Sequence, residues 1–174
     1  MSQQPARDDR LRLFFAVFLA PELRDAAVAV QEDIGRVRAR VKWVEPDNLH
    51  FTVKFLGDTP SSAVADLSDA ARQVADRHGQ FILHLAGVGA FPRPASPNAI
   101  WIGCTEGAAE LCALAGDLER TLHEAGLAAP EARVFRAHLT IGRNKDRATN
   151  AALGEAIERA ARTDLGCFAV TRLS

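Results

Sequence analysis

The apolar residues of this chain recur with two different periods, and these alternate along the sequence. Short runs that are apolar throughout, or in which apolar and polar positions alternate, predict β-strands, and longer stretches with apolar residues three or four positions apart predict helices. The predicted strands are Leu11–Leu19, Leu49–Leu56, Phe81–Leu85, Ala99–Gly103, a strand that holds His138, and Cys167–Arg172. The predicted helices are Pro21–Ile34, Ser61–Arg77, Gly107–Ala125 and Asn150–Arg162.

The segments between these elements are less regular. Residues 36–44 alternate basic and apolar side chains, which predicts an extended segment with one charged face. Residues 57–60 contain Gly and Pro and are expected to close the second strand. The polar residues 1–10 predict a flexible tail, and the Pro-rich residues 92–98 predict a loop.

One arrangement of elements occurs twice. A strand, a helix and a strand with the tripeptide H-x-T follow one another in residues 13–55 and again in residues 99–141. His50 and His138, which begin the two tripeptides, are 88 positions apart, about half of the chain, as a duplicated two-lobed fold requires. Because long connections with helices permit antiparallel pairing, we assign the chain to the α+β class rather than to a parallel doubly wound fold.

Length and composition fit one compact domain. The chain has 174 residues, of which 48% are hydrophobic and 25% charged, so we expect a single domain over residues 1–174. The longest apolar run, Leu13–Ala20, is far shorter than the roughly 20 residues that span a bilayer, so we expect a soluble, cytoplasmic protein that makes no membrane contact. We also expect a monomer. Cys104, Cys112 and Cys167 form no C-x-x-C pair, which predicts buried free thiols rather than disulfides or a structural zinc site.

The charge is nearly balanced over the whole chain but not locally. A net charge of −1 argues against a general nucleic-acid coat held by bulk electrostatics. Two clusters are nevertheless basic: Arg36, Arg38, Arg40 and Lys42, and then Arg133, Arg136, Arg143, Lys145 and Arg147. Each cluster is near one H-x-T tripeptide in the sequence, a placement that suits a small phosphorylated substrate.

The two H-x-T tripeptides are the strongest functional feature of the sequence. They are His50-Phe51-Thr52 and His138-Leu139-Thr140, followed by Val53 and Ile141 respectively. With five His and eight Thr in the chain, about 0.2 such tripeptides are expected by chance, so two copies in similar strands indicate function.

Strand geometry places the polar members of each copy together. Alternate side chains of a strand share a face. One face is then expected to carry His50, Thr52 and Lys54, and the other Phe51, Val53 and Phe55; the second copy sets His138 and Thr140 against Leu139 and Ile141. A polar face of this kind is typical of a wet cleft. Gly142 can break the second strand or form a bulge, which would let Arg143 turn back toward His138.

This set of side chains suits acid–base catalysis on a phosphate ester. Free imidazoles titrate near neutral pH, so one can act as a base while the other acts as an acid. Threonine hydroxyls and a cation such as Arg143 or Lys54 can hold phosphate oxygens. The sequence has no H-E-x-x-H motif and no carboxylate triad, so we expect no metal and no cofactor.

The motifs and their flanks resemble the 2H phosphoesterase superfamily, specifically the RNA 2′,3′-cyclic phosphodiesterases once named 2′-5′ RNA ligases. The resemblance rests on residues 12–17, 48–57, 91–92, 100–103 and 135–143. It implies a bilobal α+β fold in which two pseudo-symmetric antiparallel β-sheet lobes with outer helices enclose a central cleft. It also implies metal-independent opening of a terminal 2′,3′-cyclic phosphate, on RNA or on small cyclic nucleotides, to a 2′-phosphate.

The resemblance implies a role for each matching residue. His50 would be the proton donor to the leaving O3′, and His138 the proton acceptor that activates water. Thr52 and Thr140 would bind phosphate oxygens. Arg143 matches the basic residue that ends the second motif, and Phe55 matches the aromatic residue that ends the first.

Two alternatives remain open from the sequence. Ligation of RNA by 2′-5′ bonds would use the same acid–base pair in the reverse direction, so the motifs do not distinguish it from hydrolysis. A nucleotide-binding module that holds AMP without turnover would keep the cleft, although a binder has no need of both proton-transfer groups.

Overall fold

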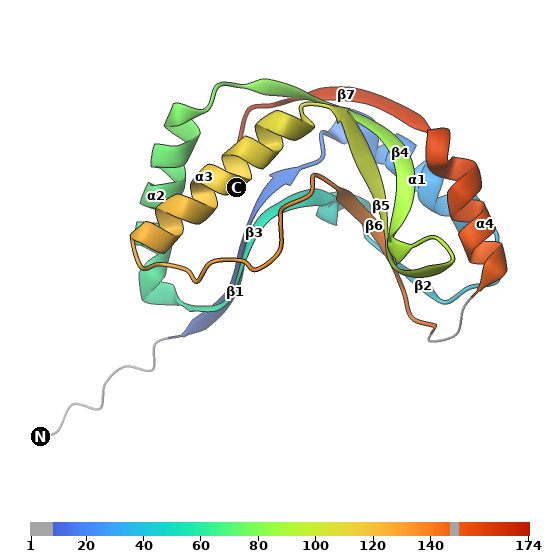
Figure 1. Ribbon diagram of the computed structural model, residues 1–174, viewed down its shortest axis with the longest axis horizontal. Coiled ribbons are helices and arrows are strands. Elements are labelled where there is room, and N and C mark those ends of the chain that lie inside the picture. The colour runs from blue at the N-terminus through green and yellow to red at the C-terminus, as the bar shows by residue number, and fades with distance from the viewer. Residues whose placement is uncertain (1–8, 147–149) are drawn as a thin grey trace, which may run out of the picture.

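The computed structural model describes residues 9–146 and 150–174 and contains two antiparallel sheets that form the inside of an arch (Figure 1). The smaller sheet pairs β1 (Arg10–Phe18) with β3 (His50–Pro60). The larger sheet has the order β2 (Val41–Trp43), β6 (Leu139–Asn144), β5 (Ser96–Glu106), β4 (Phe81–Arg93) and β7 (Asp164–Val170). The α+β class with two antiparallel sheets is thereby confirmed.

Helices cover the outside of the arch (Figure 1). They are α1 (Pro21–Gly35), α2 (Val64–Arg77), α3 (Ala108–Glu124) and α4 (Ala151–Arg159). Helices α2 and α3 pack on each other beside the smaller sheet, while α1 and α4 lie against the larger sheet. Short 3₁₀ turns occur at Pro46–Asn48, Ser61–Ala63 and Ala160–Arg162. No helix within the described residues combines the length and the apolar character that crossing a membrane requires.

The repeat found in the sequence corresponds to repeated strand pairing. In both halves the strand that precedes a helix pairs antiparallel with the motif strand that follows it, β1 with β3 and β5 with β6. The two sheets are nevertheless unequal, with two strands and five strands. One reason is that β2, which lies between α1 and β3 in the sequence, pairs with β6 in the larger sheet.

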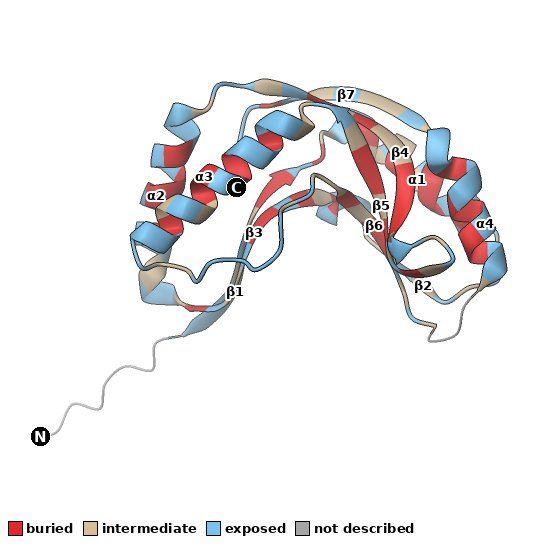
Figure 2. Cartoon of the chain, viewed as in Figure 1, coloured by how far each residue is buried: buried red, intermediate tan, exposed pale blue. Residues whose placement is uncertain are grey.

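The apolar members of both motifs form part of the core. Phe51, Leu139 and Ile141 are completely buried, and Val53 is nearly so. Figure 2 shows that the buried residues lie along the strands and on the helix faces turned toward them. Each such side chain stabilises the fold by about 1.5–3 kcal/mol, so the core fixes the strands that carry the motif histidines.

Several sequence-based boundaries were wrong at strand ends. The first strand begins at Arg10, inside the predicted tail, whose residues 1–8 lie outside the described part. Strand β3 continues to Pro60 because Gly57, at φ +71°, absorbs a register shift. The predicted loop 92–98 is mostly a hairpin, since β4 runs to Arg93 and β5 starts at Ser96. Strand β7 ends at Val170 instead of Arg172 and begins earlier, at Asp164.

Two other segments also differ from the prediction. Of residues 36–44, only Val41–Trp43 form a strand, because the amides of Arg36 and Val37 still bond to carbonyls of the last turn of α1. The predicted helix Asn150–Arg162 ends as an α-helix at Arg159 and continues as a 3₁₀ turn. The boundaries of the remaining helices differ from the predictions by three residues or fewer.

Candidate active site

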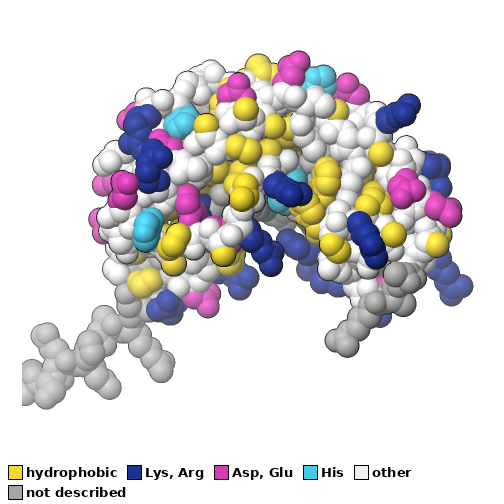
Figure 3. Space-filling view, viewed as in Figure 1, with side chains coloured by type: hydrophobic (Ala, Val, Ile, Leu, Met, Phe, Trp, Pro, Cys, Tyr) yellow, Lys and Arg dark blue, Asp and Glu magenta, His cyan; other side chains and the backbone are white. Residues whose placement is uncertain are grey.

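The two motif strands come together although they belong to different sheets. Strands β3 and β6 contact each other where the two sheets meet. The hollow of the arch contains His and Lys or Arg side chains next to apolar ones (Figure 3). The expected cleft therefore lies between the sheets, with one motif contributed by each.

Both motif histidines make the same hydrogen bond to the backbone. The Nδ1 atom of His50 lies 2.7 Å from the carbonyl oxygen of Asn48, and the Nδ1 atom of His138 lies 2.7 Å from that of Arg136. Because a carbonyl only accepts hydrogen bonds, Nδ1 is the protonated nitrogen in each neutral ring. The Nε2 atoms of both rings are thereby left for proton transfer.

Aromatic side chains fix the planes of the two imidazoles. Phe14 stacks on His50 with ring centroids 4.9 Å apart and an interplanar angle of 22°, and Phe18 lies tilted at 5.6 Å. Phe91 meets His138 edge-on at 5.0 Å and 87°. A hydrogen bond together with a ring contact leaves each imidazole little freedom to rotate, as preorganised catalysis requires.

The threonines lie on the same faces as the histidines. Thr52 is opposite Ala16 and His50 opposite Phe18 in the β1–β3 pairing, so both side chains stand on one side of the smaller sheet. Thr52 is exposed, and Thr140 is half-buried opposite Trp101 on β5. Both hydroxyls are thus available beside the imidazoles of their own motifs.

Arg143 reaches the motif face through a bulge in β6. The pairing with β5 shifts between Ile100 and Trp101, which leaves Ile141 without a partner there. Ile141 and Gly142 are both buried as a result, and a Cβ atom on Gly142 would lie 2.7 Å from the Trp43 side chain. The next residue, Arg143, is exposed on the opposite side, where Thr140 also lies. The turn of Arg143 expected near Gly142 is therefore confirmed.

A second bulge corrects the faces predicted for the first motif. The β1–β3 pairing shifts between Phe15 and Ala16, so Val53 has no partner and the alternation of β3 reverses after it. Lys54, expected beside His50 and Thr52, is only 5% exposed and points into the interior. Phe55, expected in the core by alternation, is instead 45% exposed on the cleft side. Carboxylates bind the ammonium of Lys54, so this side chain is not a member of the expected phosphate site.

Strand β1 contributes residues to which the sequence analysis gave no role. Phe14 and Phe18 are about 40% exposed, and the guanidinium of Arg12 lies 5.0 Å from the centre of the Phe55 ring. The period of two in residues 12–18 was a usable signal, because it places Arg12, Phe14 and Phe18 on one face. Large apolar side chains that stay exposed beside a polar motif are typical of a binding surface.

The basic clusters meet through the pairing of β2 with β6. Lys42 is directly opposite Arg143, and the amide of Lys145 donates to the carbonyl of Arg40. Lys42, like Arg143, is exposed. Arg147, predicted in the second cluster, lies outside the described residues. Two cations that are distant in the sequence thus stand side by side next to the second motif.

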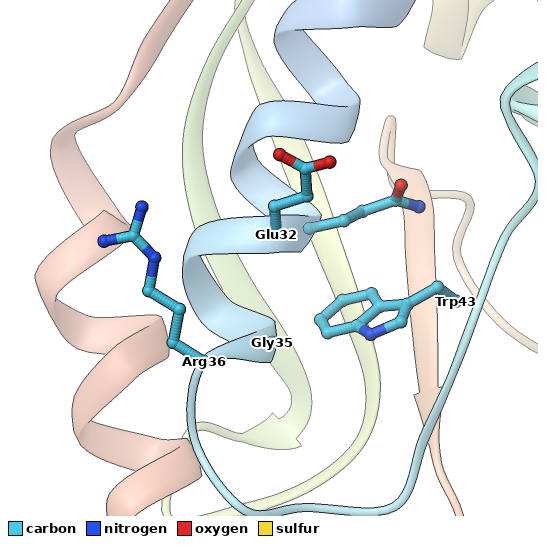
Figure 4. Close-up of a pocket in the computed structure, with 5 residues that line it drawn as sticks. Glu32, Gly35, Arg36 and Trp43 are labelled. Carbon is cyan, nitrogen blue, oxygen red and sulfur yellow. The ribbon is translucent and has the colours of Figure 1, made fainter.

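The other face of β2 carries a separate pocket of about 360 Å³ (Figure 4). Its lining consists of Gln31, Glu32, Gly35, Arg36 and Trp43. Trp43 packs over Gly142 and Gly35, on the side of the sheet that faces α1. The pocket contains no motif residue and lies on the side opposite Arg143.

The remaining titratable groups with shifted pKa values lie outside the motifs. Burial raises the pKa of the Cys104 thiol to about 11, and all three cysteines are free. The expectation of free thiols is confirmed, but Cys112 and Cys167 are exposed and Cys104 is only partly buried. The carboxyl of Asp117 has a lowered pKa because it accepts a hydrogen bond from Arg77 in the contact between α2 and α3. The described residues gather no set of three or more His, Cys, Asp and Glu side chains that could hold a metal ion.

Comparison with known proteins places this arrangement in a family. The family model of the 2′-5′ RNA ligase superfamily matches residues 16–174. The chain therefore belongs to the 2′-5′ RNA ligase superfamily, the group of 2H phosphoesterases that the two motifs resemble.

Curated relatives and solved structures are similar over most of the chain. An RNA 2′,3′-cyclic phosphodiesterase of Methanothermobacter thermautotrophicus is 32% identical over 95% of this chain and 88% of its own length. One of Archaeoglobus fulgidus is 36% identical over 78% of this chain and 73% of its own length. The crystal structure of TT0787 of Thermus thermophilus superposes with a TM-score of 0.77 at 27% identity, covering 94% of this chain and 86% of that one.

Proposed function

We propose that the protein hydrolyses a terminal 2′,3′-cyclic phosphate to a 2′-phosphomonoester, with His50 as general acid and His138 as general base. The single observation that carries the proposal is the matched pair of imidazoles on contacting strands, each held at Nδ1 by a carbonyl two residues earlier. Curated relatives named RNA 2′,3′-cyclic phosphodiesterase support the same enzyme class.

The proton transfers follow from the free Nε2 atoms. The neutral His138 accepts a proton from water at Nε2 while the water oxygen bonds to phosphorus. The bond from phosphorus to O3′ breaks, and the protonated His50 gives its Nε2 proton to O3′. The products are a 2′-phosphate and a free 3′-hydroxyl. Exchange of one proton with solvent at each ring restores the starting state.

Thr52, Thr140 and Arg143 stabilise the charge that develops on the phosphate. Both hydroxyls stand beside a motif histidine, and the β6 bulge brings Arg143 to the same side. Donors aimed at developing charge typically contribute 10²–10³ in rate, about 3–4 kcal/mol each. Phe55 and Phe14 border this region and provide apolar surface for the nucleoside.

The test is hydrolysis of a short RNA with a 2′,3′-cyclic phosphate end in excess EDTA. The wild-type protein should form the 2′-phosphate, identified by ³¹P NMR, and His50→Ala and His138→Ala should each lose at least about 10²-fold in kcat. His123→Ala is the matched control, because His123 is an exposed residue of α3 outside the motifs. Undiminished turnover by His138→Ala would contradict the proposal, and loss of turnover in EDTA would contradict metal independence.

The same samples separate the alternatives. Formation of a 2′-5′ bond between RNA halves would appear as a longer product and would show that the acid–base pair also runs in reverse. Tight binding of AMP in calorimetry, without any turnover, would identify a binding module instead. Hydrolysis without a longer product supports the phosphodiesterase assignment.

A further inference from the structure

The most deeply buried ion pair described involves a residue for which the proposed mechanism has no use. The side chain of Lys54 is 5% exposed. Its Nζ atom lies 2.7 Å from Oε2 of Glu119, 3.0 Å from the carbonyl oxygen of Ala129 and 3.8 Å from Oε2 of Glu131. These three acceptors surround an ammonium that the bulge at Val53 has turned away from the cleft.

The partners of Lys54 lie on two further segments. Glu119 belongs to α3, while Ala129 and Glu131 belong to the connection between α3 and β6, residues 125–138. The amide of Glu131 donates to Oε1 of Glu119, so this one carboxylate binds both Lys54 and the connection. Strand β3, helix α3 and the connection are thus joined by one network of polar contacts.

This ion pair is better suited to positioning the connection than to stabilising the fold. Burying an ammonium away from water costs several kcal/mol unless it is paired with an anion. Even a paired one can often be replaced, together with its partner, by apolar residues with little loss of stability. Burial raises the pKa of the Glu119 carboxyl. Hydrogen bonds from Lys54 and from the Glu131 amide lower this pKa by more, so it lies below its ordinary value. What an apolar replacement could not supply is the directed bond to the Ala129 carbonyl.

The connection held by Lys54 leads directly into the second motif. It ends at His138, and its Arg136 provides the carbonyl that binds Nδ1 of that ring. Residues 129–134 are exposed and belong to no helix or strand, and Val134 is 90% exposed. For this exposed stretch, Lys54 supplies an anchor from the strand of His50.

We propose that Lys54 is a positioning residue that fixes the connection between α3 and β6 to the His50 strand and thereby sets the placement of His138 against His50. Its effect on catalysis rests on the proposed function, whereas its effect on the connection does not. Lys54 itself touches no reacting group. It acts through Glu119, Ala129 and Glu131.

The test compares variants by two independent measurements. Lys54→Met removes the contacts, and Lys54→Met combined with Glu119→Leu also removes the carboxylate that would otherwise stay buried without its partner. Lys54→Arg keeps the cation. Arg77→Met is the matched control, because it breaks a salt bridge to Asp117 in the same lobe without touching the connection.

The first measurement is amide hydrogen exchange in residues 127–137. Exchange should be at least about tenfold faster in both Met variants and unchanged in Arg77→Met, with Lys54→Arg between them. The second is turnover: kcat should fall about tenfold or more in the Met variants while KM changes less than about threefold, because misplaced catalytic groups slow chemistry more than binding.

The outcomes are separable. Wild-type exchange in a folded double variant would overturn the proposal, as would faster exchange with unchanged kcat. If the wild-type protein turned over no cyclic phosphate, the proposed function would fail, yet the exchange data would still decide whether Lys54 anchors the connection.

Discussion

Phe14 and His50 form a stacked pair across the β1–β3 ladder, with ring centroids 4.9 Å apart and planes inclined by 22°. Such a contact is worth about 0.5–1.5 kcal/mol beyond the buried area. Because Phe14 fixes the plane in which His50 would present Nε2, Phe14→Ala should lower kcat about two- to tenfold. Steady-state kinetics on a cyclic phosphate measures this. Ile82→Ala, at another exposed apolar residue on β4, should leave kcat at the wild-type value.

The bulge in β6 provides a second prediction. A Cβ atom on Gly142 would come within 2.7 Å of the Trp43 side chain and 2.9 Å of Val41. Gly142→Ala should therefore lower the free energy of unfolding by about 1–3 kcal/mol. It should also reduce turnover, because relief of the clash displaces Arg143.

The control for this substitution is another glycine. Gly116 lies on the exposed side of α3 and has no atom within 4 Å of a built Cβ. Gly116→Ala should raise the free energy of unfolding by about 0.5–1 kcal/mol, since Ala favours a helix. Urea unfolding measures the free energy of unfolding of both variants. Equal changes in the two would show that the contact with Trp43 does not destabilise Gly142→Ala.

How far the sequence predicts the site depends on strand regularity. The motif histidines and threonines were placed correctly on shared faces because alternation holds from His50 to Thr52 and from His138 to Thr140. Alternation fails at Lys54, since the extra residue at Val53 arises from pairing with β1, which is distant in the sequence. A bulge of this kind leaves no local signal in a run of favourable strand residues.

Long-range pairing also explains what was missed in the fold. The segment 92–98 was interpreted as a loop because it is rich in proline and lacks apolar periodicity. Pro92 is nevertheless paired opposite Pro97 near the end of the hairpin, where proline costs few ladder hydrogen bonds. Lys42 and Arg143 belonged to two separate basic clusters in the sequence. Only the β2–β6 pairing makes them neighbours.

A pair on the outer strands predicts how stability depends on pH. Nε2 of His84 lies 2.7 Å from Oδ1 of Asp164, and this hydrogen bond raises the pKa of His84 and lowers that of Asp164. The stabilisation by His84 is fully present below the pKa that His84 has in the unfolded chain. It disappears as pH rises through the raised pKa of His84 in the folded protein. The stabilisation by Asp164 is present above the pKa that Asp164 has in the unfolded chain. It disappears as pH falls through the lowered pKa of Asp164 in the folded protein.

The pair should therefore stabilise the protein between these two limits. Urea unfolding of wild type and Asp164→Asn, followed from acid to alkaline pH, should show a difference that is largest in mildly acidic solution and smaller at alkaline pH, where the carboxylate keeps only the hydrogen bond from the Gly166 amide. Asp66→Asn serves as a control for loss of a carboxylate, since Asp66 lies in the first turn of α2. A constant difference at every pH would contradict the role of the pair.

The proposed acid–base mechanism predicts a bell-shaped dependence of kcat/KM on pH. One imidazole must carry a proton while the other does not, so turnover falls on both sides of an optimum. Rates measured from about pH 5 to 9 at constant ionic strength test this, and a flat profile would contradict the assignment of His50 and His138. His84→Asn should keep both limbs of the bell, because its side chain bonds to Asp164 outside the motifs.

Lys42 and Arg143 predict that RNA strands bind more tightly than single nucleotides. The two cations are paired across β2 and β6, and Lys42 continues the row of polar side chains beyond the proposed phosphate site. Lys42→Gln should therefore raise KM for a cyclic-phosphate RNA of several nucleotides and lower the slope of log KM against log salt by about 0.7, the value for one contact to a single strand. KM for a cyclic mononucleotide should change little, because that substrate ends at the reacting phosphate. An equal rise in KM for both substrates would place Lys42 at the reacting phosphate itself.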